Sequence, residues 1–224
     1  VFSGMDKGDG MSNETLVVWN SALLKSAKLI FPMLIFSVFF AEPIMTCMYG
    51  DIYAQSSIYF VIKNLSGLFY IIPFYPIILA IGKTNSYANA HMIAAFMIVM
   101  AEYVVCKTFD SAVYVAITSE LCKLFKIWLL LRVIANYAHK KITELLPPRP
   151  MTILIMISVL ASLPPFLLLD FLNMNKFIVL FVCLGFFLVD YYVLCWICKV
   201  TYRDIAGGFL KNKSRLNAVV KILP

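Results

Sequence analysis

Apolar residues occur along this chain in long blocks, and each block is followed by a short polar segment. Residues 23–48 form the clearest block, which begins near Lys25 and Lys28 and ends before the turn-forming pair Gly50-Asp51. An α-helix rises about 1.5 Å per residue, so about twenty apolar residues match the roughly 30 Å hydrocarbon core of a bilayer. The block therefore predicts a transmembrane helix that starts on a basic side and ends in a small acidic loop.

Five later blocks have the same character and predict five more transmembrane helices. The full expected set is residues 23–48, 56–81, 88–106, 111–136, 151–169 and 177–200. The predicted fold class is an all-α integral membrane protein with a six-helix transmembrane bundle. It has three parts: a cytoplasmic lead-in at residues 1–22, the six-span bundle at residues 23–200, and a basic cytoplasmic tail at residues 201–224.

The composition agrees with a membrane protein, since 62% of the residues are hydrophobic and 14% are charged. A soluble domain of this length rarely exceeds about half apolar residues. The net charge of +7 comes from loops and the tail, and no basic patch interleaved with aromatic residues accompanies it. We therefore expect a membrane partner rather than a nucleic acid.

Lysine and arginine residues are distributed unevenly between the two sets of loops. The Asp-containing set holds only Lys107 and Lys176, whereas the other set holds Lys7, Lys25, Lys28, Lys83, Lys140, Lys141, Arg149, Lys199, Arg203, Lys211, Lys213, Arg215 and Lys221. Because cytoplasmic loops carry the excess of Lys and Arg, this distribution predicts that both termini are cytoplasmic.

Charged residues inside the predicted helices are the candidate functional groups. Glu120, Lys123 and Lys126 follow one another at spacings of three, which places them on one arc of a helix, and Lys63 adds a cation on the second helix. A charge at the membrane centre costs about 2.5–3.5 kcal/mol, so that arc must face protein or water. Glu120 can neutralise Lys123, which leaves Lys126 as surplus positive charge.

These charges allow two interpretations. In the first, Lys63, Lys123 and Lys126 form a cationic cavity that binds a phosphorylated or otherwise anionic substrate, and Glu102, Glu120 and Asp190 are candidates for ion pairing or ion coupling. In the second, Lys63 reaches out to the membrane surface and the other lysines merely pair with Glu102 or Asp190.

Motifs of enzymes and of metal or cofactor sites are not found. Neither a phosphate-binding loop, a dinucleotide fingerprint, a GxSxG nor an HExxH sequence is present, and His91 and His139 are isolated. Cys195 and Cys198 form a CxxC pair without a second ligand pair, so we expect the cysteines to act as small apolar residues. The sequence predicts a protein that is not an enzyme, with no metal and no cofactor.

The order of features in residues 1–85 resembles the bacterial polysaccharide flippases, which belong to the multidrug/oligosaccharidyl-lipid/polysaccharide exporter superfamily. The matching features are Phe2-Ser3, Gly8-Asp9, Lys25 and Lys28, Pro32, the Ala41-Glu42-Pro43-Ile44 run, Gly50 with Tyr53, and Gly82-Lys83. Beyond residue 85 the resemblance is architectural.

The resemblance implies a function as well as a fold. Members have two helical lobes around a central cavity, and this chain is similar to the C-terminal portion of a fourteen-helix member, which would supply one lobe of a two-lobe, alternating-access transporter. The implied activity is flipping of an undecaprenyl-diphosphate-linked oligosaccharide across the bacterial inner membrane, for surface polysaccharide or lipopolysaccharide (O-antigen) biosynthesis. The implied partners are this lipid-linked oligosaccharide, membrane lipids, the missing N-terminal lobe and polysaccharide assembly proteins.

Three alternatives remain open on the sequence alone. A multidrug or cation antiporter of the same superfamily would favour a negatively charged cavity, which the lysines oppose. A membrane glycan polymerase or acyltransferase would favour a large outer loop or an intramembrane histidine–acid pair. A purely structural membrane subunit is disfavoured only by the buried charges.

Overall fold

The computed structural model describes residues 13–72, 74–169, 175–200 and 202, and this part of the chain is helical throughout, with turns between the helices and no strand. The elements are α1 (Asn13–Phe39), α2 (Ala41–Tyr49), the 3-10 helix η1 (Asp51–Ser56), α3 (Ser57–Gly67), α4 (Phe74–Ala80), α5 (Thr84–Thr108), α6 (Ala112–Ala138), α7 (Ile142–Leu145), α8 (Pro148–Leu168) and α9 (Lys176–Ile197). The all-α prediction is confirmed for these residues.

The first predicted helix is two helices. The expected span over residues 23–48 is divided at Phe40, whose backbone (φ −103°, ψ 24°) leaves the helical region, into α1 and α2. Pro43 explains the break, because proline has no amide hydrogen to donate to the carbonyl of Phe39 and its ring crowds that carbonyl. In α2 the proline occupies the first turn, where a missing donor is tolerated.

Helix α1 also begins ten residues earlier than expected, at Asn13, so the second half of the predicted lead-in is helical. Trp19 is fully buried there, and its indole nitrogen donates a hydrogen bond of 2.8 Å to the carbonyl of Leu145. This bond fixes the start of α1 against α7. Residues 1–12 of the lead-in, and all of the tail except Tyr202, lie outside the described residues.

The second predicted helix is also interrupted, and the expectation of one continuous helix over residues 56–81 is wrong. Helix α3 ends at Gly67, where the amide nitrogens of Leu68, Phe69 and Tyr70 bond to carbonyls three residues back. These tighter turns bring the chain to α4, whose third residue is Pro76. Pro76 is tolerated in this first turn but could not donate to the preceding turn of a continuous helix.

The remaining four predicted helices are present with shifted ends: α5 is longer than expected at both ends, α6 and α8 differ by one to three residues at each end, and α9 ends three residues early. Helices α5 and α6 form a hairpin, with Gly82 (φ 69°) ahead of α5 and His139 (φ 51°) ending α6 in the left-handed conformation. Helix α8 starts with Pro148 in its first turn, and α9 is capped by the Asn175 side chain, which accepts a hydrogen bond of 3.0 Å from the amide of Phe177.

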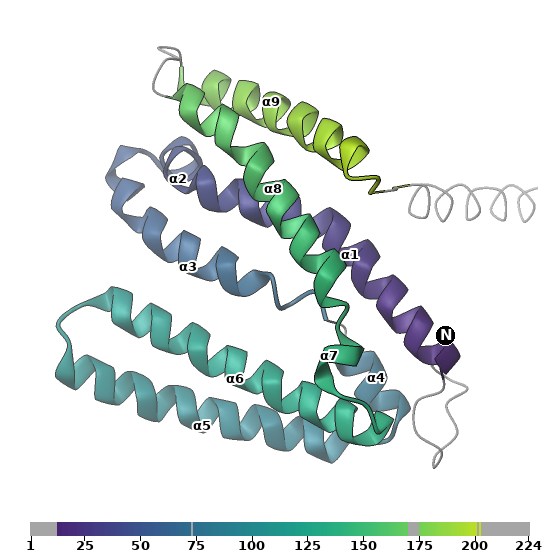
Figure 1. The fold of residues 1–224 in the computed structure, drawn as a ribbon. Coiled ribbons are helices and arrows are strands. Elements are labelled where there is room, and N and C mark those ends of the chain that lie inside the picture. The colour runs from purple at the N-terminus through teal and green to yellow at the C-terminus, as the bar shows by residue number, and fades with distance from the viewer. Residues whose placement is uncertain (1–12, 73, 170–174, 201, 203–224) are drawn as a thin grey trace, which may run out of the picture.

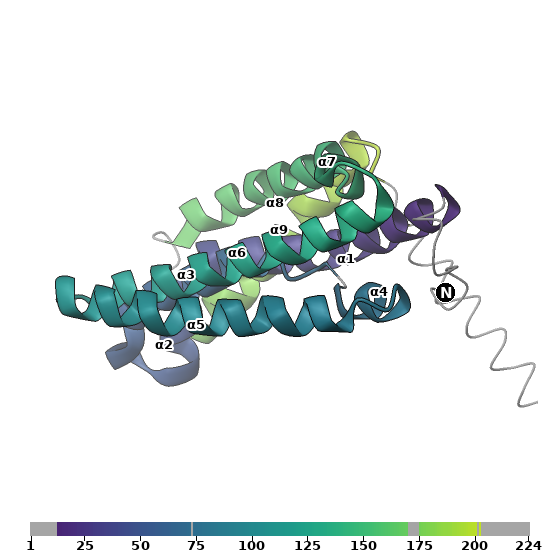
Figure 2. The same cartoon turned by 90° about the horizontal axis from the view of Figure 1, so that it is seen from below.

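The helices form two groups joined by α3. Figure 1 shows α1, α8 and α9 side by side, the α5–α6 hairpin on the opposite side, and α3 between them. The view from below in Figure 2 shows the α5–α6 hairpin in front of α3 and α1. Helix α3 therefore contacts both groups, and its polar side chains can reach α6.

Two apolar cores hold this arrangement together. One core packs the N-terminal half of α1 against α4, α6, α7 and the start of α8, and the other packs the end of α1 against α8 and α9. At the far end of the bundle, Lys176 forms an ion pair with Asp51, so the starts of α9 and η1 lie together. These two residues belong to the loop set that holds few Lys and Arg residues.

Four of the described helices are long and apolar enough to cross a membrane: the α1 segment Thr15–Phe39, and α5, α8 and α9. The two other predicted spans are not among these four, and each has a physical reason. Helix α6 is 27 residues long but carries Glu120, Lys123, Lys126 and Arg132, and the α3–α4 segment is interrupted. The structure is that of an all-α membrane protein with four apolar candidate spans.

Candidate functional site: a lysine–glutamate cluster between α3 and α6

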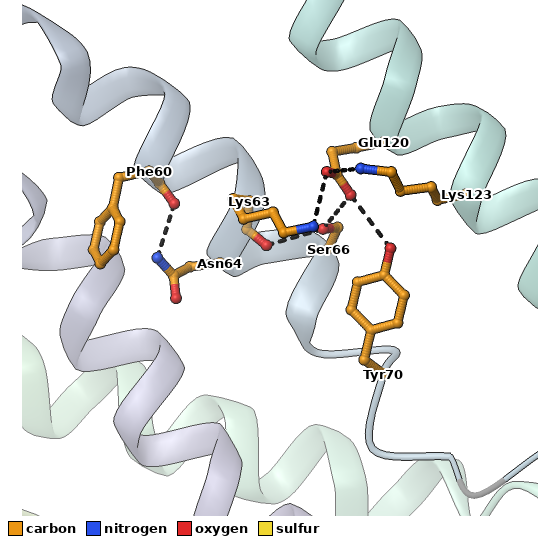
Figure 3. Close-up of polar contacts among 7 residues, drawn as sticks. All are labelled: Phe60, Lys63, Asn64, Ser66, Tyr70, Glu120 and Lys123. Carbon is orange, nitrogen blue, oxygen red and sulfur yellow. Dashed lines mark hydrogen bonds and ion pairs between the residues drawn. The ribbon is translucent and has the colours of Figure 1, made fainter. Parts of the chain in front are cut away.

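A buried carboxylate marks the place where α3 meets α6. Glu120 lies in the first third of α6 and is 8% exposed, one of four buried polar or charged residues in the described part of the chain. Figure 3 shows its side chain pointing from α6 toward α3. A charge at this depth is stable only when it is paired or hydrogen-bonded, so its surroundings define the site.

Two lysines bind the same oxygen of this carboxylate. The Oε1 atom of Glu120 lies 2.7 Å from the Nζ of Lys123 and 3.3 Å from the Nζ of Lys63. The predicted pair between Glu120 and Lys123, one helical turn apart, is thus confirmed. The Lys63 side chain is 60% exposed, and its ammonium reaches across from α3 to Glu120, a pairing that neither interpretation of the sequence included.

Two hydroxyl groups from α3 and the turn after it hold the other oxygen. The Oγ of Ser66 lies 2.6 Å from Glu120 Oε2, and the Tyr70 hydroxyl lies 3.5 Å from it (Figure 3). Ser66 Oγ is also 2.9 Å from the carbonyl of Lys63, but a hydroxyl has one hydrogen to donate. Because a bond to a carboxylate is stronger than a bond to a neutral carbonyl, Ser66 donates to Glu120.

Tyr70 contributes to the cluster in a second way. The Nζ of Lys63 lies 5.5 Å from the centre of the Tyr70 ring, within the range of a cation–π contact. Tyr70 follows the point where α3 ends, so the break in the second predicted helix is what brings this ring next to Lys63 and Glu120. The interruption therefore positions part of the site.

The cluster carries a surplus of positive charge. Lys63 and Lys123 share one carboxylate, and Lys126, one turn further along α6, is half-buried and lies within electrostatic reach of both lysines. Within the described residues no carboxylate lies within ion-pair distance of Lys126. His91 on α5 also lies within electrostatic reach of Lys126. The surplus cation that the sequence predicted is present.

The other two carboxylates that we considered do not join this cluster. Glu102 is partly buried on α5 and lies near Cys122, and Asp190 is partly buried on α9, which packs against α8 and α2. Neither forms an ion pair with a lysine in the part of the chain that is described. The alternative in which Glu102 or Asp190 neutralises the helix lysines is therefore not the arrangement seen.

Ser66 and Tyr70 are members of the site that the sequence did not indicate by themselves. Lys63, Ser66 and Tyr70 are spaced by three and four residues, so a pattern search for polar groups on one helix face could have joined them. The CxxC pair shows no such convergence: Cys195 is buried in the core of α9, Cys198 is exposed, and both are free thiols.

The arrangement has the chemistry of an anion site. Lys63, Lys123 and Lys126 present ammonium donors, whereas the single hydrogen of the Tyr70 hydroxyl is directed to Glu120. Within the described residues no group of three or more His, Cys, Asp or Glu side chains could hold a metal ion. No protein-family model, curated protein or solved structure matches this chain.

Proposed function

We propose that this chain is one lobe of a two-lobe, alternating-access transporter that flips an undecaprenyl-diphosphate-linked oligosaccharide across the bacterial inner membrane. The observation that supports this most strongly is the lysine–glutamate cluster, which places three lysines and one carboxylate at the junction of α3 and α6. The resemblance of residues 1–85 to polysaccharide flippases supplies the class of substrate.

The charge of the cluster matches a diphosphate. Three lysines against one glutamate leave a net charge of +2. Each charge in a membrane costs about 2.5–3.5 kcal/mol, so an unmatched lysine is unfavourable unless it has an anionic partner during the working cycle. A diphosphate offers several anionic oxygens, and charge-assisted hydrogen bonds to phosphate are about twice as strong as neutral ones. The surplus charge favours an anionic substrate over the cation of an antiporter.

In this proposal α6 and the α3–α4 segment are two further membrane crossings, which gives six in all. The charges of α6 then face α3 rather than lipid, as the contact between Lys63 and Glu120 requires. Both termini are cytoplasmic, and the ion pair between Asp51 and Lys176 lies on the outer side. The N-terminal lobe and polysaccharide assembly proteins complete the working transporter.

The decisive experiment replaces Lys126 in the full-length protein. We expect Lys126→Gln to reduce glycan export at least tenfold in a strain that lacks its own flippase, with protein abundance nearly unchanged. A loss of ~1.4 kcal/mol of anion binding is enough for that factor. Lys126→Arg should retain part of the activity because it keeps the charge.

Arg132→Gln is a matched control on the same helix. Arg132 is exposed, and its guanidinium lies 5.3 Å from the Trp128 ring, away from the cluster, so its replacement should leave export unchanged. If Lys126→Gln lowers abundance in proportion to export, Lys126 is a structural group and the proposed anion site is wrong. Normal export by Lys126→Gln would reject the proposal as well.

A further inference from the structure

A groove lies on the other side of the molecule, where α1, α2 and α9 meet. It has a volume of about 520 Å³, which is within the range of ligand pockets in proteins, roughly 300–1,000 Å³. Apolar side chains of α1 and α9, such as Phe36, Leu184 and Phe187, form most of its lining. None of the lysine–glutamate cluster residues takes part in it, so this groove is a separate site.

The groove is open along its length. Phe36, Phe187 and Tyr191 are buried and form its floor, whereas Met33 and Leu188 line it and are largely exposed. Both walls belong to helices long and apolar enough to cross a membrane. An open groove between two such helices is accessible to the molecules of a bilayer, so a lipid is the first occupant to consider.

One end of the groove is polar and the rest is not. Lys28, Tyr191 and Tyr202 stand together at this end, with the Lys28 ammonium 5.7 Å from the centre of the Tyr202 ring. Ser37, further along, donates its hydroxyl to the carbonyl of Met33 at 2.8 Å and so offers no free hydrogen. The groove thus has a cationic, hydroxyl-bearing head and an apolar body.

The length of the apolar body fits one leaflet of a bilayer. From Leu180 to Tyr191 the groove follows eleven residues of α9, about 16 Å at 1.5 Å per residue. This is roughly half of the ~30 Å hydrocarbon core. The polar end lies toward the end of α9 that the Lys and Arg distribution assigns to the cytoplasm, where the leaflet is rich in anionic lipids.

We infer that this groove binds one acyl chain of an anionic phospholipid, with the headgroup phosphate next to Lys28. The apolar lining accounts for the acyl chain, and the position of Lys28 accounts for the anionic headgroup. The inference does not depend on the proposed substrate, because it concerns a different face and a bulk membrane lipid.

The test is native mass spectrometry of the full-length protein, released from micelles that contain equal amounts of dioleoyl phosphatidylglycerol and dioleoyl phosphatidylcholine. The wild-type protein should retain phosphatidylglycerol in preference. Leu188→Trp should lose most of the retained lipid, since the indole fills the groove. The matched control is Val189→Trp, which changes an exposed neighbour that does not line the groove and should behave as wild type.

The headgroup contact has its own variant. Lys28→Gln should reduce the preference for phosphatidylglycerol about fivefold, the effect of ~1 kcal/mol for one lysine near an anionic membrane surface. Leu188 is 55% exposed, so its replacement leaves the packed core unchanged, and an unaltered thermal unfolding midpoint checks this. Equal retention by Leu188→Trp and Val189→Trp would overturn the inference. Equal retention of the two lipids by the wild-type protein, or displacement of phosphatidylglycerol by an equal amount of undecaprenyl phosphate, would also overturn it.

Discussion

The lysine–glutamate cluster predicts a specific, unequal division of stability among its members. Glu120→Gln keeps the size of the side chain and an acceptor oxygen for Ser66 but removes the negative charge. The three lysines then face one another without a counter-charge. We expect a loss of stability, because Glu120 is the group that joins α3 to α6 in this region.

The magnitude follows from the exposure of each partner. The bond from Lys123 is short, at 2.7 Å, and its side chain is 27% exposed, so the usual range of about 1.5–3 kcal/mol for a hydrogen bond to a charged group applies. The contact with Lys63 is longer, at 3.3 Å, and the lysine is 60% exposed, so it contributes about 0.2–1 kcal/mol. Together the loss is about 2–4 kcal/mol.

A pair of double-mutant cycles measures this division. The variants are Glu120→Gln combined with Lys123→Gln, and Glu120→Gln combined with Lys63→Gln, each with its single mutants. The free energy of unfolding is measured by SDS titration of the full-length protein in mixed micelles. We expect a coupling free energy above ~1.5 kcal/mol for Lys123 and below ~1 kcal/mol for Lys63.

The prediction that can fail is the order of the two coupling free energies, Lys123 above Lys63. If Lys63 couples to Glu120 as strongly as Lys123 does, the exposed contact between the helices is not screened by water, and the geometry described above does not govern the energetics. A value near zero for both pairs would show that these ion pairs add no net stability and would contradict the magnitudes derived from their distances and exposure.

Three further predictions concern other parts of the chain. Tyr202→Phe removes a hydroxyl that lies 3.2 Å from the carbonyl of Lys28, so we expect a loss of about 1 kcal/mol in the free energy of unfolding, and an unchanged value would contradict the bond. Gly82→Ala places a side chain on a residue with φ of 69° and should destabilise the protein by roughly 1–2 kcal/mol, whereas Gly185→Ala, inside α9 with open space around it, should not. In a background without native cysteines, a Cys at Asp110 should react with an impermeant thiol reagent added outside intact cells, and a Cys at Thr143 should not; the reverse pattern would reject the proposed orientation.

The sequence predicts the helical fold well where apolar length alone decides it. The blocks at residues 88–106, 151–169 and 177–200 became α5, α8 and α9, each end within four residues of the prediction, because an uninterrupted apolar segment with few competing signals forms a helix. The prediction of continuous helices from the sequence failed where proline and glycine act together with tertiary contacts. Gly67 is such a position, since a side chain there would meet Leu34 of α1 at 3.2 Å. Only the folded structure shows that close approach.

The sequence predicts the contact within one helix of the site, but it does not predict the contact between two helices. The spacing of Glu120 and Lys123 gives their pair directly, because residues three apart on a helix are neighbours. The approach of Lys63 from α3 depends on how α3 packs against α6, and the sequence does not specify it. For the same reason Glu102 and Asp190 stayed open candidates, although neither pairs with a lysine in the described part of the chain.

Pro32 shows how the apolar spans depend on residues far away in the sequence. Proline at position 32 cannot donate an amide hydrogen to the carbonyl of Lys28, four residues earlier, yet α1 continues through it. The hydroxyl of Tyr202 donates to this carbonyl at 3.2 Å, and that of Tyr191 lies 3.5 Å from it. In a membrane an unsatisfied carbonyl costs several kcal/mol, so the two tyrosines replace a bond that water cannot supply. These two tyrosines also form the polar end of the groove, because the side chains that bond to the Lys28 carbonyl lie beside the Lys28 ammonium. The tolerance of Pro32 in α1 and the amphipathic character of the groove therefore have one structural cause.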